Sequence, residues 1–335
     1  MTRAWLESEL ANLRVPDESA REAARSRSDD ILRPAGATQV LDDVAIWVAG
    51  WQRNPRPLIA QPAALIFAAN HGVASAGVSK YPVEVTASMM AAFHAGSSTI
   101  NAWASVAGAT VDVVDVGVEL PSGDIRTVSA VSDERFDQVV SAARDAVDAL
   151  ATDLLVIGEM GIGNTTAAAA VCHALLGGSA EDWVGRGTGV DDDGLSIKRE
   201  AVRTAVSRLR RELPGASPLD VLAEVGGLEL VAMAAAIIAA RQRSIPVVLD
   251  GYVVTASALA LASSAQDALQ HCWVGHRSAE PGHGKVLAHL NARPLVDLGL
   301  RLGEASGGMA AVPLIRMACA GLSSVPTFSE WFGAR

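Results

Sequence analysis

The sequence predicts an α/β fold in which a mostly parallel sheet is covered by helices on both faces. Short apolar runs of strand length alternate along the chain with longer segments of helical period. Most of these runs are continuously apolar, which is typical of strands that are buried on both faces. Clusters of glycine and polar residues follow the runs, at the edge where open α/β sheets bind their ligands. We therefore expect one composite site beyond the carboxyl ends of the strands.

The first half of the chain changes from helices to strands at a group of prolines. Trp5, Leu6 and Leu10 have helical spacing, and residues 1–55 are predicted to be helical. Pro55 and Pro57 end this pattern. The predicted elements that follow are a strand over 63–69, helices over 83–95 and 97–107, a strand over 110–118, a polar loop over 119–133 and an amphipathic helix over 134–150.

The second half continues the alternation of strand and helix. We predict strands over 154–157, 246–249 and 272–274, and helices over 166–176, 195–213, 218–243, 255–269, 285–291, 295–302 and 309–319. We expect three parts: a small helical segment (1–58), a large α/β domain (59–320) and a C-terminal tail (321–335). The last long helix is expected to join the N-terminal helices in a small helical domain.

Composition argues against several classes of partner. The formal net charge of −10 is unfavourable for binding nucleic acid or an anionic membrane surface. The N-terminus lacks the apolar run of a signal peptide. The most apolar helix, 221–240, carries Glu224 and Glu229, which argues against a membrane span. The 3 cysteines are far apart and form no CxxC pair, as is typical of reduced thiols in a cytoplasmic protein.

The clearest functional pattern lies in residues 154–166. An apolar strand runs into three glycines, after which a helix begins, and the N–H groups at such a helix start lack internal partners and bind anions. The spacing is close to that of a P-loop, but Asn164 stands where that motif needs lysine. We predict a phosphate cradle that is not an NTPase site, with the Glu159 carboxylate inside it. The structural alternative is a tight turn with Thr166 as the helix cap.

Two further charged residues are candidates for the site. Glu304 lies in a break of small residues between apolar helices, where desolvation would raise its pKa and suit it to proton abstraction near neutral pH. The alternative is an exposed glutamate at a helix cap. Lys198 is one of three lysines and follows a Gly/Asp loop, so it is either a phosphate-neutralising residue or a solvated helix lysine.

Signals for metals and dinucleotides are weak, and we predict no metal and no cofactor. Asp191, Asp192 and Asp193 could suggest a divalent cation, but an acidic cluster in a loop or at a helix N-terminus is favoured. The histidines lack HxxH and HExxH spacing, which leaves loop-fixing hydrogen bonds as the favoured role for His71, His276 and His283. No GxGxxG fingerprint supports NAD.

Nine segments between residues 60 and 320 occur in the order of a known family. They are 70–73, 77–86, 158–166, 185–189, Lys198, 226–229, 249–251, 276–283 and 298–304. The most specific are GEMGIGNTT at 158–166 and LGLRLGE at 298–304. Together they resemble the nicotinate-nucleotide–dimethylbenzimidazole phosphoribosyltransferases of cobalamin lower-ligand assembly.

The resemblance implies a reaction and a site. The phosphoribosyl group of nicotinate mononucleotide would pass to 5,6-dimethylbenzimidazole with inversion at the anomeric carbon, giving α-ribazole 5′-phosphate and nicotinate. The family's catalytic base corresponds to Glu304. Its phosphoribosyl contacts correspond to Glu159, Gly161, Gly163, Asn164, Lys198 and Ser278, and its acceptor-base pocket to Ser79, Tyr81 and Ser88. The resemblance also implies a Rossmann-like sheet with a small helical domain, and a homodimer.

The implied chemistry suits these residue types. Nicotinate leaves from a cationic N-ribosyl pyridinium, so no metal is needed to neutralise a leaving pyrophosphate. The acceptor loses a ring proton as its other nitrogen attacks, and a carboxylate base contributes roughly 10²–10⁴-fold to such a step. Because the sugar gains oxocarbenium character, a second carboxylate, Glu159, is favourable near the ribose.

Three departures from the family pattern concern the loops and the acceptor. Asn70 replaces the usual Asp, Ser88 the usual Gln, and Ala305-Ser306 the usual Gly-Thr. The change at Ser88 leaves another benzimidazole, another azole or a purine open as the acceptor. A non-catalytic nucleotide-binding protein is the alternative from another class, and a P-loop kinase is the weakest option.

Overall fold

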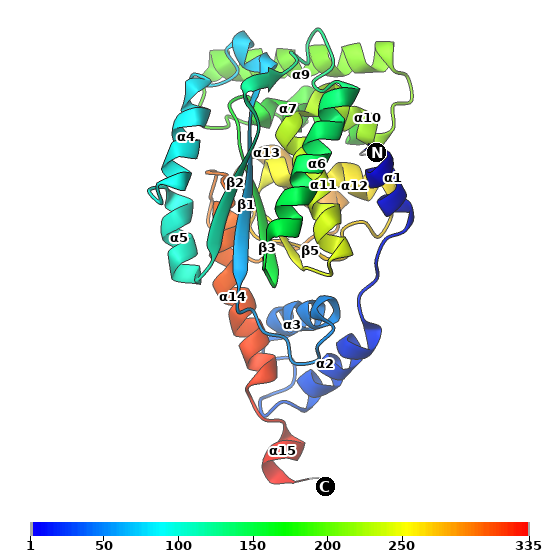
Figure 1. Cartoon of the computed structure of the whole chain (residues 1–335), viewed down its shortest axis with the longest axis vertical. Coiled ribbons are helices and arrows are strands. Elements are labelled where there is room, and N and C mark those ends of the chain that lie inside the picture. Colours follow the sequence, from blue (N-terminus) through cyan, green and yellow to red (C-terminus); the bar gives the residue numbers. More distant parts are fainter. Residues whose placement is uncertain (1–2, 334–335) are drawn as a thin grey trace.

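A computed structural model of the chain, which describes residues 3–333, contains a five-stranded parallel sheet (Figure 1). The strand order is β2-β1-β3-β4-β5, and each neighbouring pair is parallel. The bounds are Pro62–His71 for β1, Thr110–Ser122 for β2, Leu154–Met160 for β3, Val247–Leu249 for β4 and Cys272–Val274 for β5. The predicted α/β class and parallel sheet are confirmed.

The register brings polar side chains to one edge of the sheet. Every residue of β1 is buried, and Phe67 in β1 pairs with Glu159 in β3. Asn70 and His71 then end β1 beside the turn that follows β3. Parallel strands thus deliver the polar residues that follow them to the same edge.

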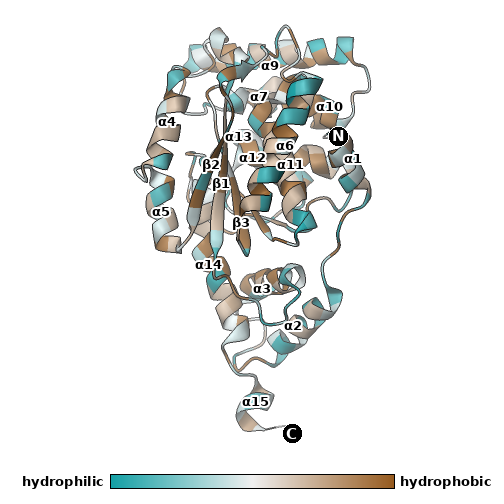
Figure 2. Cartoon of the chain, in the orientation of Figure 1, coloured by the Kyte–Doolittle hydropathy of each residue, from teal (hydrophilic) through white to brown (hydrophobic). Residues whose placement is uncertain are grey.

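Helices cover both faces of the sheet, as predicted. One face packs against α6 (Asp133–Ala149), α7 (Asn164–Leu176), α11 (Leu228–Gln242) and α12 (Tyr252–Ser264), with α1 (Arg3–Ala11) and α9 (Asp192–Glu212) outside them. The other face packs against α3 (Gln39–Gln52), α5 (Thr99–Ala107) and α14 (Ser306–Ser323). Figure 2 shows hydrophobic colours concentrated on the strands and on α11, and hydrophilic colours on much of α9 and α2.

A small helical lobe lies below the sheet in Figure 1. It contains α2 (Glu18–Asp30), α3, the end of α14 and α15 (Phe328–Phe332), so the C-terminal helix joins the N-terminal helices as predicted. The first helix, α1, packs instead against α6 and α11 of the larger part. The domain boundaries at residues 58 and 320 stay a prediction.

The prediction of a helix over 295–302 is wrong. Leu295 and Val296 donate their N–H groups to the carbonyls of Val274 (3.1 Å) and Gly275 (3.0 Å), which extends the segment alongside the end of β5. Gly299 and Gly303 have φ of 66° and 81°, which a right-handed helix excludes. Tertiary hydrogen bonds therefore override the apolar spacing of this segment.

The predicted helix over 218–243 is divided by a π-helical turn. Its parts are α10 (Pro218–Val221), the π-helix Leu222–Gly226 and α11. The remaining helices are the 3-10 helix Gly72–Ala76, α4 (Glu84–His94), α8 (Ala180–Trp183) and α13 (Pro281–His289). Within residues 3–333 no helix is both long and apolar enough to cross a membrane.

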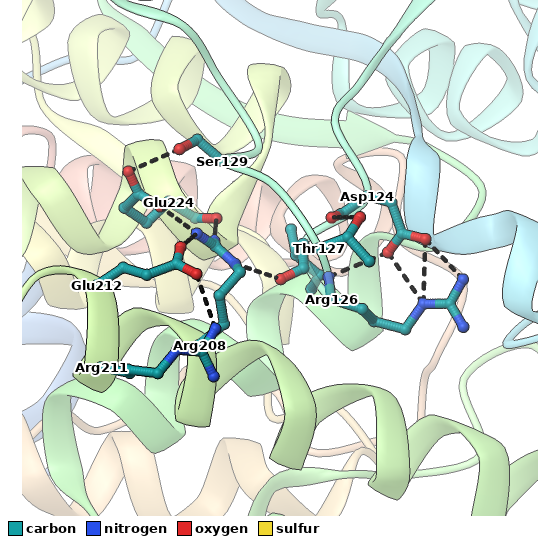
Figure 3. Close-up of polar contacts among 9 residues, drawn as sticks. Asp124, Arg126, Thr127, Ser129, Arg208, Arg211, Glu212 and Glu224 are labelled. Carbon is teal, nitrogen blue, oxygen red and sulfur yellow. Dashed lines mark hydrogen bonds and ion pairs between the residues drawn. The ribbon is translucent and has the colours of Figure 1, made fainter.

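Arg208 on α9 holds the π-helix in place (Figure 3). This guanidinium is 3% exposed and donates to the carboxylate (2.7 Å) and the carbonyl (2.8 Å) of Glu224. It also donates to the carbonyl of Ile125 (3.0 Å), in the loop that follows β2. We refer to these contacts as the Arg208 clamp. The π-helix leads directly into Gly227 and Glu229, which lie beneath the candidate site.

Candidate active site

A cleft with a volume of about 90 Å³ lies at the carboxyl ends of β3, β4 and β5. It is lined by residues of 159–165 after β3, 251–253 after β4, 276–280 after β5, and by the loops 187–188 and 301–303. Segments that are far apart in sequence therefore form one composite site, as the pattern of strand-end clusters predicted.

The turn after β3 can only be built from glycine. A Cβ at Gly161 would lie 2.4 Å from the carbonyl oxygen of Ala69, and Gly163 has φ of 103°. Helix α7 begins at Asn164 with Gly163 as its N-cap and no side-chain cap, so the structural alternative, a turn with Thr166 as the helix cap, does not hold. Because no side chain occupies its N-terminus, the first N–H groups of α7 suit an anion in the cleft.

Glu159 is a buried carboxylate at the floor of the cleft. It is 8% exposed, and the Asn164 side-chain amide donates to it. Burial raises the pKa of Glu159 well above its usual value, and the nearby carboxylates of Asp250, Glu229 and Glu304 raise it further. The hydrogen bond from Asn164 opposes this shift. Asn164, which breaks the P-loop pattern, thus stabilises the charged form of Glu159.

Glu304 lies against the end of β3. Its N–H donates to the carbonyl of Glu159 (3.1 Å), and both Glu304 and Ala305 have φ of 62°. Glu304 is only 6% exposed, so it is not an exposed helix cap. Burial, with a smaller effect from the charge of Asp250, raises the pKa of Glu304 to about 7. A carboxylate with this pKa can accept a proton near neutral pH.

Lys198 extends from α9 to the start of α7. It is 1% exposed, and its ammonium donates to the Thr165 hydroxyl (2.9 Å). Burial lowers the pKa of Lys198 to about 8, while the carboxylate of Glu280 favours the charged form. Glu280 itself accepts the N–H of Gly187 (2.8 Å). Lys198 is therefore a buried cation at the anion-binding end of α7, not a solvated helix lysine.

Ser278 lines the cleft from the loop after β5. Its N–H donates to Nδ1 of His283 (2.8 Å), and its hydroxyl accepts the N–H of Glu280 (3.3 Å). The other ring nitrogen of His283 contacts the Thr255 hydroxyl (3.1 Å). His283 thus fixes a loop by hydrogen bonds, the role favoured for it from the sequence.

The three predicted acceptor residues lie apart from this cleft. Ser79 and Tyr81 are in the loop before α4, where the Ser79 hydroxyl accepts the N–H of Tyr81 (3.1 Å). Ser88 is exposed on α4 and donates to the carbonyl of Glu84 (3.2 Å). In Figure 1, α4 lies beside β2, and its first turn contacts the end of β1 through Thr86 and Asn70, on the opposite side of β3 from the cleft residues after β4 and β5. None of the three lines the cleft.

Three buried charged residues of the site received no role from sequence reasoning, although they lie in segments that carry the family resemblance. Asp250, Glu229 and Glu280 are each less than 9% exposed and belong to short Gly-containing clusters. Glu229 pairs with His71, and both side chains are fully buried beneath the turn at Gly161. The available signal was a charged residue in an otherwise apolar run, which is rare unless the charge is paired.

Asn70 connects β1 to its neighbours. Its side-chain NH₂ donates to the carbonyls of Val83 (3.2 Å) and Val118 (3.1 Å), and its oxygen accepts the Thr86 hydroxyl (2.7 Å). An aspartate could not donate these bonds. The departure from the family pattern at this position is therefore used for bonding in this chain.

No group of three or more His, Cys, Asp or Glu side chains within residues 3–333 is arranged to hold a metal ion. Asp191 is the N-cap of α9 and accepts the N–H of Gly194 (2.9 Å). This agrees with the favoured interpretation of the aspartate run as an acidic helix N-terminus.

Comparison with known proteins places the site in context. A family model described as "Phosphoribosyltransferase" matches residues 13–331. A protein of Jannaschia sp. (strain CCS1) named nicotinate-nucleotide–dimethylbenzimidazole phosphoribosyltransferase is 46% identical over 329 residues, covering 98% of this chain and 97% of that protein. A protein of Ruegeria pomeroyi with the same name is 48% identical, covering 94% and 92%. The crystal structure of CobT from Thermus thermophilus superposes with a TM-score of 0.89 at 41% identity, covering 95% of this chain and 99% of the other.

Proposed function

This chain belongs to the nicotinate-nucleotide–dimethylbenzimidazole phosphoribosyltransferase family, and we propose that Glu304 is the general base of its reaction. The enzyme transfers the phosphoribosyl group of nicotinate mononucleotide to 5,6-dimethylbenzimidazole. The observation that carries the proposal for Glu304 is a buried carboxylate, with a pKa of about 7, beside the glycine-rich turn.

The donor binds in the cleft at the carboxyl end of the sheet. Its 5′-phosphate lies at the start of α7, near Gly161, Gly163 and the ammonium of Lys198. The uncapped helix start and the buried cation support this placement. The ribose lies near Glu159 and Ser278, both of which line the cleft. Asn164 orients Glu159 through its side-chain hydrogen bond.

In the chemical step, Glu304 removes the ring N–H proton of the acceptor while the other ring nitrogen attacks the anomeric carbon. The bond to the nicotinate nitrogen breaks, and its electron pair returns to that nitrogen, which neutralises the pyridinium. Burial disfavours the charged form of Glu159, but a cationic donor beside it favours that form, and the carboxylate then stabilises positive charge that develops on the ribose. The hydrogen bond from Asn164 favours this charged form.

The acceptor base extends from the cleft toward α4, where the family resemblance assigns its recognition to Ser79, Tyr81 and Ser88, although none of the three lines the cleft. The short side chain of Ser88 is exposed and leaves room beside α4 for a base of different shape. The alternative acceptor is therefore another benzimidazole, another azole or a purine. Turnover compared across these acceptors decides between them, and Ser88→Gln should change the order of preference.

A cytoplasmic homodimer is the expected form of the enzyme. Tyr81 and Val83 at the start of α4 are 46% and 37% exposed, which supports a further contact at this surface. The three free cysteines support a reducing compartment. Light scattering of the purified protein measures the subunit number.

The decisive assay follows nicotinate release from nicotinate mononucleotide and dimethylbenzimidazole. Glu304→Gln should lower kcat by about 10²–10⁴-fold, the usual contribution of a general base. Glu200→Gln, an exposed glutamate on α9, is the matched control and should have wild-type activity. Full activity of Glu304→Gln would exclude this residue as the base. Release with none of the benzimidazoles or purines would contradict the reaction, and binding without turnover would favour a nucleotide-binding protein.

A further inference from the structure

Asp250 caps a helix that belongs to another part of the chain. It directly follows β4, is 1% exposed, and accepts the N–H of Gly308 (2.7 Å) in the first turn of α14. The backbone N–H groups of Gly307 and Ala305 also favour the charged form of this carboxylate. The N-cap of α14 in sequence is Ala305, which has no side chain that could cap. The Asp250 carboxylate therefore does what an N-cap side chain normally does.

The residues that this cap holds have a costly backbone conformation. Glu304 and Ala305 both have φ of 62°, a region that residues other than glycine seldom occupy. Such a conformation persists only where its surroundings fix it. Here the carbonyl of Glu159 holds the N–H of Glu304 on one side (3.1 Å). Asp250 holds the following N–H groups on the other side.

Few polar groups surround the Asp250 carboxylate, so its negative charge is poorly compensated. Nε2 of His276 lies 3.6 Å from Oδ1 of Asp250, and a Cβ at Gly307 would lie 1.9 Å from the His276 ring. Oδ2 of Asp250 is buried and has no hydrogen-bond partner among the described residues. The other charged groups that act on this region are the carboxylates of Glu159, Glu229 and Glu304.

We propose that Asp250 is a positioning residue for the reaction, which fixes the turn that carries Glu304 and whose negative charge keeps Glu304 basic. The inference rests on the proposed role of Glu304. Two separable effects follow from the two features of Asp250. Its hydrogen-bond acceptor sets the geometry of the turn, and its charge favours protonation of the neighbouring carboxylate. The negative charge of Asp250 adds to burial in raising the pKa of Glu304, in agreement with the second effect.

Two variants separate these effects. Asp250→Asn keeps an oxygen that can accept the N–H of Gly308 but removes the charge. It should move the acidic limb of the kcat/KM profile to lower pH by about one unit, with kcat reduced less than about 10-fold. Asp250→Ala removes the acceptor as well and should lower kcat by about 100-fold, because a misplaced base loses much of its effect. The KM for nicotinate mononucleotide should change less than about 3-fold in both.

The controls distinguish failure of this inference from failure of the proposed base. Glu304→Gln is measured first: if it is active, the assignment of the base is wrong. If Glu304→Gln is inactive, an unmoved acidic limb in Asp250→Asn together with wild-type kcat in Asp250→Ala would overturn the role of Asp250. Asp17→Asn, at the N-cap of α2 in the helical lobe, is the matched cap variant and should alter neither quantity. If Asp250→Ala does not fold, the acidic limb of Asp250→Asn alone decides the question.

Discussion

The pKa values of Glu304 and Lys198 are both shifted toward neutral pH, that of Glu304 upward and that of Lys198 downward. Burial destabilises the charged form of any group, so it raises the pKa of an acid and lowers that of an amine. The pKa of Glu304 is about 7 and that of Lys198 about 8. Between these values Glu304 is mostly deprotonated and Lys198 mostly protonated. The site is thus adjusted to a narrow pH range by its burial.

We expect kcat/KM to be greatest between about pH 7 and 8. Below this range Glu304 becomes protonated and cannot accept the acceptor's proton. Above it Lys198 loses its charge, so the KM for nicotinate mononucleotide should rise. Initial rates from pH 5.5 to 9.5 measure both limbs of this profile.

In Lys198→Met the KM for nicotinate mononucleotide should be higher by roughly 10-fold or more and should no longer rise above pH 8. Lys285 is exposed, so Lys285→Met is the control and should resemble the wild type. A donor KM that is constant up to pH 9.5 in the wild type would contradict the role of Lys198.

At the scale of elements, the site is supported by two contacts outside it. The Arg208 clamp fixes the π-helix that leads to Glu229, and the end of β3 supports the turn that carries Glu304. π-helices are rare and occur mostly as single turns, frequently at functional sites. Both contacts can be weakened without changing a residue that lines the cleft.

Arg208→Met should lower the free energy of unfolding by about 3–5 kcal/mol, because it leaves the Glu224 carboxylate and two carbonyl groups without their cation. Arg211→Met on the same helix is the matched control, since its side chain is 70% exposed and its ion pair with Glu212 contributes little. Denaturant titration of both variants measures the difference. Equal free energies of unfolding for the two variants would show that the Arg208 clamp does not stabilise the fold.

Gly158→Ala should displace the turn at Glu304. A Cβ at Gly158 would lie 2.2 Å from the backbone nitrogen of Ala305, which cannot move aside as a flexible side chain could. We expect a loss of about 1–3 kcal/mol of stability together with a clear fall in kcat. Gly321→Ala near the other end of α14, where a Cβ would lie 3.7 Å from Arg33, should be neutral or stabilising. Thermal unfolding and nicotinate release are the measurements, and wild-type kcat in Gly158→Ala would contradict the close packing.

Sequence patterns predicted elements better than they predicted contacts. The strands and most helices follow from apolar periodicity, and the glycine turn follows from its spacing. The segment 295–302 was mispredicted because its hydrogen bonds to β5 are tertiary, and periodicity contains no information about them. For the same reason, Glu304 could be assigned by resemblance, whereas its neighbour Asp250 could not be linked to it across 54 residues before the strand order was known.

At the scale of the whole molecule, the buried base reduces stability. The pKa of Glu304 is 4.5 without the fold and about 7 in the folded chain. Between these pH values the native state holds a proton that the unfolded state has released. The free energy of unfolding therefore falls as pH rises through this window, and the loss is complete above about pH 7.

Glu304→Gln removes this dependence and should be stabilised relative to wild type as pH rises. The difference in unfolding free energy between variant and wild type should grow by about 2.5 kcal/mol from pH 5 to pH 8. Urea titration at the two pH values tests this. Glu330→Gln is the control: ion pairs with Arg27 and Arg56 lower the pKa of Glu330 to about 2, so its effect should be the same at both. If the difference in unfolding free energy between Glu304→Gln and wild type does not change with pH, the pKa of Glu304 is not raised by folding.

The helix α14 joins the base to the far end of the molecule. It has 18 residues, or about 27 Å of helix, and its first turn follows Glu304 while its last packs with α2 and α3 in the helical lobe. In the order of synthesis, Glu304 and α14 come after every strand of the sheet and after the glycine-rich turn. The proposed base is therefore the last of the candidate site residues to enter the chain.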